Sequence, residues 1–508
     1  MQTVRKDLYC DLAIIGGGVG GCAAAICAAR RGLHVMIFEK GVSLGGLATN
    51  GYVPQVAGGI EGICLEFTER LDKIGQLRKI DPSKDYYRNP SFEPEFGKFV
   101  LEDMVVQAGA RVIYDSTCFD VEMDGANIKR VLFHTKGGVM GVTARMYIDA
   151  TGDADVAAMA GVPYEVGGAD FAGLNMSTTL GSRWSGADLV TYQAAEDAYK
   201  KEQLEKGIAN PKPLVYDLEE KWIREGKLVR HVCNPNTGFF RVIIPNMPMD
   251  NADFVTFSFH SYYCHNTDAE DISRQVLEQH QLMKGFYYFL RECVPGFANV
   301  RLVGMGNLPG VRDSRRIFGE YMLKTADLVC GTKFEDGIAR FPEMMDTHHP
   351  TNDELVFQRH AHMVNPTGSA VTIQKGCPAK MHPFGEPEGI EVRPSPRDHC
   401  DIPYRCLLPR GVDNLLAVGR CCSAEFHANG AMRIIGPAMG TGHAAAVAVD
   451  MALKAGVRPR DLDGVDVRKA LIEEENVPLD KPCDGYWKEL REKEGELFVN
   501  AGDFLGIR

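Results

Sequence analysis

The sequence predicts an α/β protein built on a parallel β-sheet, and three observations lead to this fold class. Residues 11–15 are an apolar run that ends at a cluster of glycines, residues 22–30 are rich in alanine, and residues 34–38 are a second apolar run. A strand, a tight turn, a helix and a second strand in this order form a βαβ unit with parallel strands. Glycine supplies 54 of 508 residues, more than its usual share of about 7%, and it follows no collagen period.

The turn after the first apolar run carries glycines at the spacing of a dinucleotide-binding motif. Gly16, Gly18 and Gly21 fit the pattern G-x-G-x-x-G. The first glycine allows a tight turn, the second lets backbone approach a pyrophosphate, and the third lets helix and strand pack closely. Glu39 ends the second strand, where it can accept hydrogen bonds from a ribose, and Lys40 follows it. We therefore predict a Rossmann-type domain that binds a dinucleotide through these five residues.

Three later segments favour FAD over NAD as the dinucleotide. Residues 44–49 (LGGLAT) directly follow the acidic residue and resemble the second glycine motif of flavoproteins. Residues 149–153 look like their mid-chain strand end, and residues 414–420 look like the late strand that reaches the ribityl chain. The predicted cofactor is FAD, and the further residues expected to bind it are Gly45, Gly46, Thr49, Gly152, Asp153, Gly419, Arg420, Gly440 and Gly442.

With these segments located, the chain resembles the FAD-dependent oxidoreductase family related to fumarate reductase flavoprotein subunits and to the glucose-inhibited division protein A group. The resemblance covers most of residues 8–455 and is most specific at residues 148–157, 315–321, 402–409 and 419–446. It implies a glutathione-reductase-like flavin fold in sequence-distant pieces, with an inserted substrate domain. The chain departs from the family at Phe426, where histidine is frequent and the imidazole here comes one position later, and at His443, where glutamine is common.

We expect two domains, of which the flavin-binding one is interrupted in the sequence. Residues 1–165 form its first part, with further strand candidates at residues 111–115, 130–134 and 143–150. Residues 166–400 form the inserted α+β substrate domain, and residues 401–456 complete the flavin-binding domain. Residues 457–508 are charged, contain three prolines, and are expected to form a helical tail on the surface or on a neighbouring subunit.

Two helices stand out in the second half of the chain. Thr267 or Asp268 is expected to cap a helix that runs to about Cys293 and has an apolar face at helical spacing. Residues 436–455 are mostly glycine, alanine and small apolar residues, which indicates a tightly packed, buried helix. In family relatives the N-terminus of this second helix faces the pyrimidine edge of the flavin, where its dipole stabilises negative charge.

Three clusters are candidates for the substrate pocket and for the proton transfer that a flavin needs from its protein. The first is residues 425–433, between a predicted cofactor strand and the helix that meets the flavin. His427 could pass a proton there because imidazole titrates near neutral pH, and Arg433 could hold a carboxylate or an oxyanion. The alternative is a loop histidine and a surface arginine.

The second cluster contains four histidines within fifteen residues: His348 and His349, then His360 and His362. His348 could be a pocket histidine, and the alternative is an ordinary surface segment. The spacing of His360 and His362 on a strand would put both rings on one face, as a metal site requires. No cysteine or spaced carboxylate completes a ligand set, and we predict no metal.

The third cluster combines arginines of residues 312–316 and Glu320 with Tyr404 and Arg405. Guanidinium groups suit bidentate recognition of carboxylates and other polar oxygens, so Tyr404 and Arg405 are candidate catalytic residues. The alternative, of equal weight, is an ion-pair network that joins the domains.

The sequence favours an enzyme that moves a hydride between flavin N5 and a carbon of a small polar substrate, such as a hydroxy, amino or activated C=C compound. The alternatives are a non-redox flavin enzyme (a hydratase, lyase or isomerase) and an RNA-modifying flavoprotein. No second G-x-G-x-x-G follows a strand, so we expect no NAD(P)H domain; electrons would pass through the substrate, oxygen, a quinone or an external protein carrier.

Charge and cysteine usage limit the partners and the compartment. Lys and Arg number 56 against 68 Asp and Glu, a net charge of −12 that argues against binding of nucleic acid or anionic lipid. Residues 12–29 are uncharged, but five of the first ten are glycine, which a membrane-spanning helix tolerates badly. Fifteen cysteines without a C-x-x-C pair fit a reducing cytoplasm. We expect a cytoplasmic homo-oligomer without a membrane span.

Overall fold

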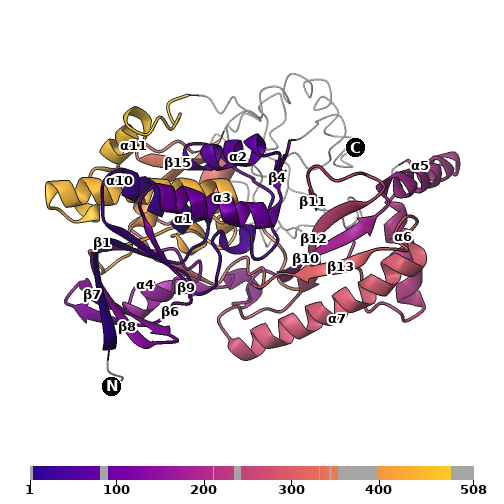
Figure 1. The fold of residues 1–508 in the computed structure, drawn as a ribbon, viewed down its shortest axis with the longest axis horizontal. Helices are drawn as coiled ribbons and strands as arrows, with labels where there is room; N and C mark the ends of the chain where they lie inside the picture. Colours follow the sequence, from indigo (N-terminus) through magenta and orange to yellow (C-terminus); the bar gives the residue numbers. More distant parts are fainter. Residues whose placement is uncertain are drawn as a thin grey trace.

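Two lobes lie side by side in the molecule, one built on a mostly parallel sheet and one on an antiparallel sheet (Figure 1). Each lobe has its own hydrophobic core. The computed structural model describes the chain in seven ranges, and the statements below concern residues 4–79, 90–209, 211–233, 242–330, 332–342, 346–352 and 399–481.

The first lobe contains a seven-stranded sheet in the order β5-β2-β1-β8-β7-β6, with β17 paired to β8. The strands β1, β2, β5, β8 and β17 pair in parallel, whereas β6, β7 and β8 form an antiparallel meander. Their bounds are β1 Val4–Ile15, β2 Val35–Phe38, β5 Arg111–Ile113, β6 Thr117–Asp124, β7 Asn127–Thr135, β8 Gly138–Asp149 and β17 Leu415–Ala417. The predicted α/β fold with parallel strands is confirmed, and so are the βαβ start and the strands near residues 111, 130 and 143.

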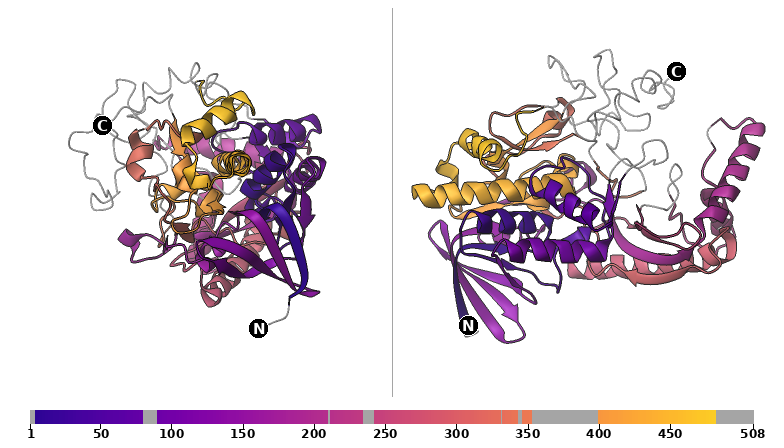
Figure 2. Two further views of the ribbon diagram at one scale, coloured as in Figure 1. Left: turned by 90° about the vertical axis from the view of Figure 1, so that its left-hand side faces the viewer. Right: turned by 45° about the horizontal axis from the view of Figure 1, so that its top comes forward.

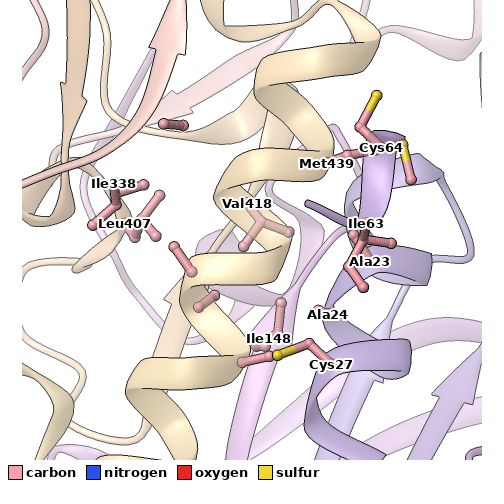
Figure 3. Packing of buried hydrophobic residues seen from close by; sticks show 14 of the residues in the cluster. Ala23, Ala24, Cys27, Ile63, Cys64, Ile148, Ile338, Leu407, Val418 and Met439 are labelled. Carbon is pink, nitrogen blue, oxygen red and sulfur yellow. The ribbon is translucent and has the colours of Figure 1, made fainter. Parts of the chain in front are cut away.

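Helices α1 (Val19–Arg30) and α10 (Ile435–Ala455) pack against each other over this sheet (Figures 2 and 3). Small side chains allow a close approach: a Cβ built on Gly442 would lie 2.0 Å from the carbonyl oxygen of Gly20. Helices α2 (Ile63–Lys73) and α3 (Pro94–Gln107) pack beside α1. The tightly packed, buried helix predicted from residue 436 onward is thus present, and it brings a segment far along the sequence onto the first βαβ unit.

The second lobe is built on a four-stranded antiparallel sheet, in the order β11-β12-β10-β13, with helices against it. Its elements are β10 Thr178–Ala187, α5 Leu189–Glu205, α6 Leu214–Arg224, β11 Val242–Ile243, β12 Ala252–Ser261, α7 Ala269–Cys293 and β13 Arg301–Met305. Asp268 caps α7 by accepting hydrogen bonds from the backbone of the first turn, so the predicted cap and end of this helix are confirmed. Trp184, Phe254 and Phe286 are fully buried in its core.

The remaining elements are short. They are η1 Gly46–Ala48, β3 Leu77–Arg78, β4 Ser91–Phe92, α4 Asp155–Met159, β9 Tyr164–Val166, η2 Ala169–Phe171, β14 Arg315–Ile317, α8 Thr325–Cys330, β15 Gly337–Phe341, β16 Cys400–Pro403, η4 Tyr404–Leu407, η5 Gly419–Cys421, α9 Asn429–Met432, η6 Pro459–Asp461 and α11 Gly464–Glu473. The predicted tail is helical at η6 and α11, and residues 482–508 lie outside the described residues. Within the described ranges, none of the helices combines the length and the apolar character that crossing a membrane requires.

Candidate functional site

The first glycine turn accepts no larger residue at two of its three motif positions. Gly16 has a φ of 107°, and a Cβ there would lie 2.3 Å from the backbone oxygen of Ala150. A Cβ on Gly21 would lie 2.0 Å from the backbone oxygen of Gly16. At Gly18 the nearest atom to such a Cβ is 3.9 Å away. The backbone at Gly18, the first residue before α1, is therefore the part of the turn that a ligand can approach.

The second glycine turn lies directly against the first. The backbone nitrogen of Gly45 donates to the oxygen of Gly17 over 2.8 Å, and Gly45 pairs with Gly18 as a parallel bridge. Gly46 has a φ of 55°, and a Cβ on it would lie 3.0 Å from the Cα of Gly18. Two backbone turns without side chains thus form one surface at the carboxyl end of β1, the position where open α/β sheets bind their ligands.

Three predicted cofactor residues surround this double turn. The carboxylate of Glu39 is buried and accepts hydrogen bonds from Gly17 N (2.8 Å) and Gly41 N (2.7 Å). These bonds fix the carboxylate beside the turn. Thr49 is fully buried and donates to the oxygen of Leu44 over 2.6 Å, which closes the second turn, whereas Lys40 is exposed.

The mid-chain and late segments reach the same sheet edge. Ala417 of β17 pairs with Asp149 of β8, and each strand is followed by a glycine with positive φ, Gly152 at 77° and Gly419 at 72°. Arg420 joins the two loops by donating to Asp153 Oδ1 over 2.9 Å. The four segments expected to contact the cofactor are therefore adjacent, although about 400 residues separate the first from the last.

Gly440 and Gly442 on α10 contact protein atoms closely. A Cβ on Gly440 would lie 2.9 Å from the Cβ of Ala339, and Gly442 faces Gly20 as described above. Their contact with a cofactor stays a prediction. At the start of α10, the Thr441 hydroxyl accepts a hydrogen bond from Gly419 N over 3.0 Å, which ties the helix to the late loop.

These residues fit an FAD molecule. The adjoining glycine turns present a surface without side chains, as a diphosphate needs, and Glu39 supplies a fixed carboxylate for a ribose. A Cβ on Gly419 would have no atom nearer than 3.6 Å, so its backbone is also open to approach. The chain thus provides backbone donors and an acid in the order along the sheet edge that the dinucleotide motif predicts.

A second group of polar residues gathers at the seam between the lobes, and its centre is Asp346. The Asp346 carboxylate lies 3.1 Å from His348 Nε2 and accepts a hydrogen bond from Arg433 Nη2 over 2.7 Å. Arg433 also donates to the backbone oxygen of Asp346 over 2.6 Å. The first and second sequence clusters are thereby brought together, with His348 and Arg433 on one carboxylate.

Burial and charge set the protonation state of this group. Burial lowers the pKa of His348 to about 4, and the positive charge of Arg312 acts in the same direction. The charges of His348 and Arg433 hold the pKa of Asp346 well below its usual value, against the effect of burial. At neutral pH His348 is therefore an uncharged imidazole beside an ionised carboxylate and two guanidinium groups.

Residues from the second lobe complete the seam. Arg312 is buried and donates to the backbone oxygen of Ser177 on the segment that enters β10, over 2.6 Å. The His260 ring, on β12, lies 5.4 Å from the His348 ring between centroids, and its Nδ1 is 3.2 Å from the Ser177 hydroxyl. Residues 254–260 (FVTFSFH) alternate partly as a strand does, which fits β12, but nothing in the sequence relates His260 to His348.

The loop before α10 contributes His427 and Asn429. His427 is buried against Phe171, with ring centroids 6.1 Å apart, and its Nε2 is 4.0 Å from Asp170. Asn429 is fully buried, and within the described part of the chain neither its amide nitrogen nor its amide oxygen has a hydrogen-bond partner. The Nε of Arg433 likewise has no hydrogen-bond partner within the described residues. Buried polar atoms are rarely left unpaired, so these atoms mark a place for a polar ligand.

The third sequence cluster divides. Arg312 joins the seam, whereas Tyr404 is buried and donates to the oxygen of Pro459 over 2.9 Å. Arg405 binds both carboxylate oxygens of Asp336, at 2.9 and 3.1 Å. The contact of Arg405 with Asp336 is that of the ion-pair alternative, and a catalytic role for Tyr404 and Arg405 stays a prediction. His360 and His362 lie outside the described residues.

The sequence was also compared with protein families and with known proteins. The sequence profile of the family described as "FAD dependent oxidoreductase" matches residues 11–471. Mercuric reductase of Streptomyces lividans is 28% identical over 151 residues, which are 29% of this chain and 31% of that protein; the chain thus spans less than a third of the length of this relative.

Two solved structures align over most of the chain at low identity. A geranylgeranyl bacteriochlorophyll reductase-like protein of Thermoplasma acidophilum is 13% identical, with a TM-score of 0.39, over 92% of this chain and 84% of its own. The p-nitrophenol 4-monooxygenase of Pseudomonas putida is 11% identical, with a TM-score of 0.43, over 99% of this chain and 96% of its own.

Proposed function

The chain belongs to the family of FAD-dependent oxidoreductases, and on this premise we propose that it transfers a hydride between flavin N5 and a carbon of a small polar substrate held at the seam of the two lobes. FAD is the cofactor, and when bound it supplies the two-electron chemistry. The protein must hold the substrate, exclude water and move one proton. We also place the chain near fumarate reductase flavoprotein subunits and the glucose-inhibited division protein A group within this family.

The FAD site in this proposal is the sheet edge with the two glycine turns. The backbone at Gly18 and Gly46 would hold the diphosphate, and Glu39 would accept hydrogen bonds from the adenosine ribose. Gly152 and Gly419, on the loops that Arg420 and Asp153 hold together, would hold the ribityl chain. The N-terminus of α10 would stabilise negative charge on the flavin pyrimidine edge through its dipole.

The observation that carries the proposed reaction is the half-buried group formed by Asp346, His348 and Arg433. An uncharged His348 accepts a proton from a substrate hydroxyl or amine at Nδ1 as the hydride departs, because Nε2 faces Asp346. Asp346 then stabilises the charged imidazole that results. Arg433 and Arg312 both act on the Asp346 carboxylate, and a guanidinium group at this place could hold an anionic oxygen of the substrate. Asn429 offers both a donor and an acceptor to the same substrate.

The domain division and the partners are part of the proposal. The proposal keeps a substrate domain at residues 166–400, inserted between the flavin-binding pieces 1–165 and 401–456. The separate core of the second lobe supports its middle part, residues 180–300, whereas Leu323, Ile338 and Phe341 pack in the core of the first lobe. An external electron carrier, a quinone or oxygen would exchange electrons with the enzyme between turnovers. A homo-oligomer in the cytoplasm stays a prediction of the sequence.

The test is anaerobic mixing of the FAD-loaded protein with a panel of small hydroxy acids, amines and sugars. The proposal predicts bleaching of the flavin absorbance by at least one compound that carries a carboxylate next to its hydroxyl or amine. Product formation without any net change in flavin oxidation state would instead support a non-redox reaction. Protein that retains no flavin after reconstitution with FAD would contradict the proposal.

A further inference from the structure

A cysteine, a histidine and a glutamate meet where α1, α10 and the end of α11 come together, and neither the FAD site nor the seam uses them. Cys27 lies on α1, His443 on α10, and Glu475 directly after α11. Their potential ligand atoms all lie within 4.8 Å of one another. Figure 3 shows the Cys27 side chain extending from α1 towards α10. We propose that these three residues bind a divalent transition-metal ion with the preferences of Zn²⁺.

The distances suit a compact coordination sphere. Zn²⁺ binds sulfur at about 2.3 Å and nitrogen or oxygen at about 2.0 Å, so its tetrahedral ligand atoms are about 3.3 to 3.8 Å apart. His443 Nε2 and Glu475 Oε2 already lie 3.2 Å apart. Binding would replace this hydrogen bond with two metal bonds and would draw the Cys27 sulfur inward by a rotation of its side chain. Sulfur, imidazole and carboxylate together are a ligand set that zinc sites use.

Arg31 already holds the glutamate in a binding orientation. Its Nη1 donates to Glu475 Oε1 over 2.7 Å, so this oxygen is occupied and Oε2 is left facing His443. Ligating carboxylates are usually fixed by such an outer hydrogen bond. The same guanidinium binds Asp450 Oδ2 over 2.6 Å, and within the described residues the buried Asp450 Oδ1 has no hydrogen-bond partner. Asp450 is thus a candidate to accept a hydrogen bond from a water in the fourth position.

The local charge favours a cation. Three carboxylates, those of Asp450, Glu474 and Glu475, lie around the guanidinium of Arg31, and the neighbouring Arg30 is paired with Glu66. Lys454 also pairs with Asp450, but its side chain is 67% exposed and largely screened. Burial keeps the Cys27 thiol protonated by raising its pKa well above the usual value. A bound metal ion would displace that proton into solvent, and no electron transfer is required.

The site would join three segments of the flavin-binding lobe. A small cavity lined by Glu61, Arg340 and Val477 reaches His443, one member of the group. His443 follows Gly442, which contacts Gly20 of the helix that begins at the first glycine turn. A metal at this point would fix α1 and α10 to each other, and its role would be structural because the seam residues lie elsewhere.

The test uses the full-length FAD-loaded protein, treated with a chelator and then dialysed against Zn²⁺ or Co²⁺ alone. The proposal predicts one tightly bound ion per chain by elemental analysis, and a sulfur-to-cobalt charge-transfer absorption in the Co²⁺ form. Cys27→Ser should lose this absorption, and His443→Gln and Glu475→Gln should lose stoichiometric binding. Arg31→Gln should weaken binding by about 10- to 100-fold, as outer-shell changes do.

Cys10→Ser is the matched control, because Cys10 lies on β1 outside the group and its loss should leave metal content and absorption unchanged. Flavin content and melting temperature verify that each variant is folded. Wild-type protein that binds no stoichiometric metal would overturn the site, and so would binding that persists in both His443→Gln and Glu475→Gln. The result does not depend on the proposed reaction, since no substrate is used.

Discussion

The two parts of the candidate active site are built by different means. At the sheet edge the protein presents backbone: the turns at Gly16–Gly18 and Gly45–Gly46 touch each other, and side chains are excluded by close contacts. At the seam it presents side chains on a half-buried carboxylate, that of Asp346, with His348 and Arg433 drawn from distant segments. A binding surface made of backbone tolerates few substitutions, but it requires of the sequence only glycines at fixed spacing. A side-chain pocket is set by charge and burial, and each of its members can be changed singly.

The largest effect should follow a substitution in the backbone surface. Gly16→Ala combines a φ of 107° with a Cβ 2.3 Å from a backbone oxygen, so the turn must move and flavin content should fall below about a tenth of wild type. The matched control is Gly109→Ala: its φ is 100°, but no atom lies within 4 Å of its Cβ. This control should cost about 1–2 kcal/mol of stability and keep FAD. Equal flavin loss in both variants would show that backbone strain, and not the close contact, sets the effect.

The next largest effect is expected at the seam. His348→Gln should slow substrate-dependent reduction of the flavin by about 100-fold or more, because a positioned base is lost, while flavin content stays unchanged. The exposed His134 on β7 provides the control, and His134→Gln should have no effect. Rapid mixing under anaerobic conditions measures both rates. A His348→Gln variant that reduces the flavin at the wild-type rate would show that His348 is not the base.

A smaller effect is expected at Asn429. Asn429→Ala should raise the apparent Kd for substrate by about tenfold, because two polar atoms that contact the ligand are lost. The free energy of unfolding should change little, since these atoms have no protein partner within the described residues. Substrate titration and denaturant unfolding measure the two quantities. Strong destabilisation with unchanged substrate binding would show that the amide serves the fold.

The smallest effect on the reaction is expected at Tyr404. Tyr404→Phe removes one hydrogen bond to Pro459 and should cost about 1 kcal/mol of stability, with flavin reduction within about twofold of wild type. Thermal unfolding and the same rapid-mixing assay test this expectation. A large loss of rate at unchanged stability would return Tyr404 to the list of catalytic residues.

The sheet edge could be predicted from the sequence because its determinants are local. Glycine spacing, an apolar run and the acid Glu39 occur within thirty residues, and each follows from backbone geometry. The seam could not be assembled in the same way. Arg312 lies near Arg315 and Arg316 in the sequence and is therefore grouped with them. The fold places Arg312 beside His348 instead, because the segment before β14 meets the segment that enters β10.

The central claim, an uncharged His348 that accepts the proton at the seam, is tested most directly by the pH dependence of flavin reduction. A histidine whose pKa is lowered to about 4 stays neutral down to that pH, so the wild-type rate should hold as pH falls and drop only near 4. Arg312→Gln removes a positive charge that lowers this pKa, so the pH at which the rate drops should rise towards 6.5. Asp346→Asn removes a negative charge that raises the pKa of His348, so the rate should drop at a lower pH than in the wild type. An acid limb that stays at one pH in all three proteins would contradict the account.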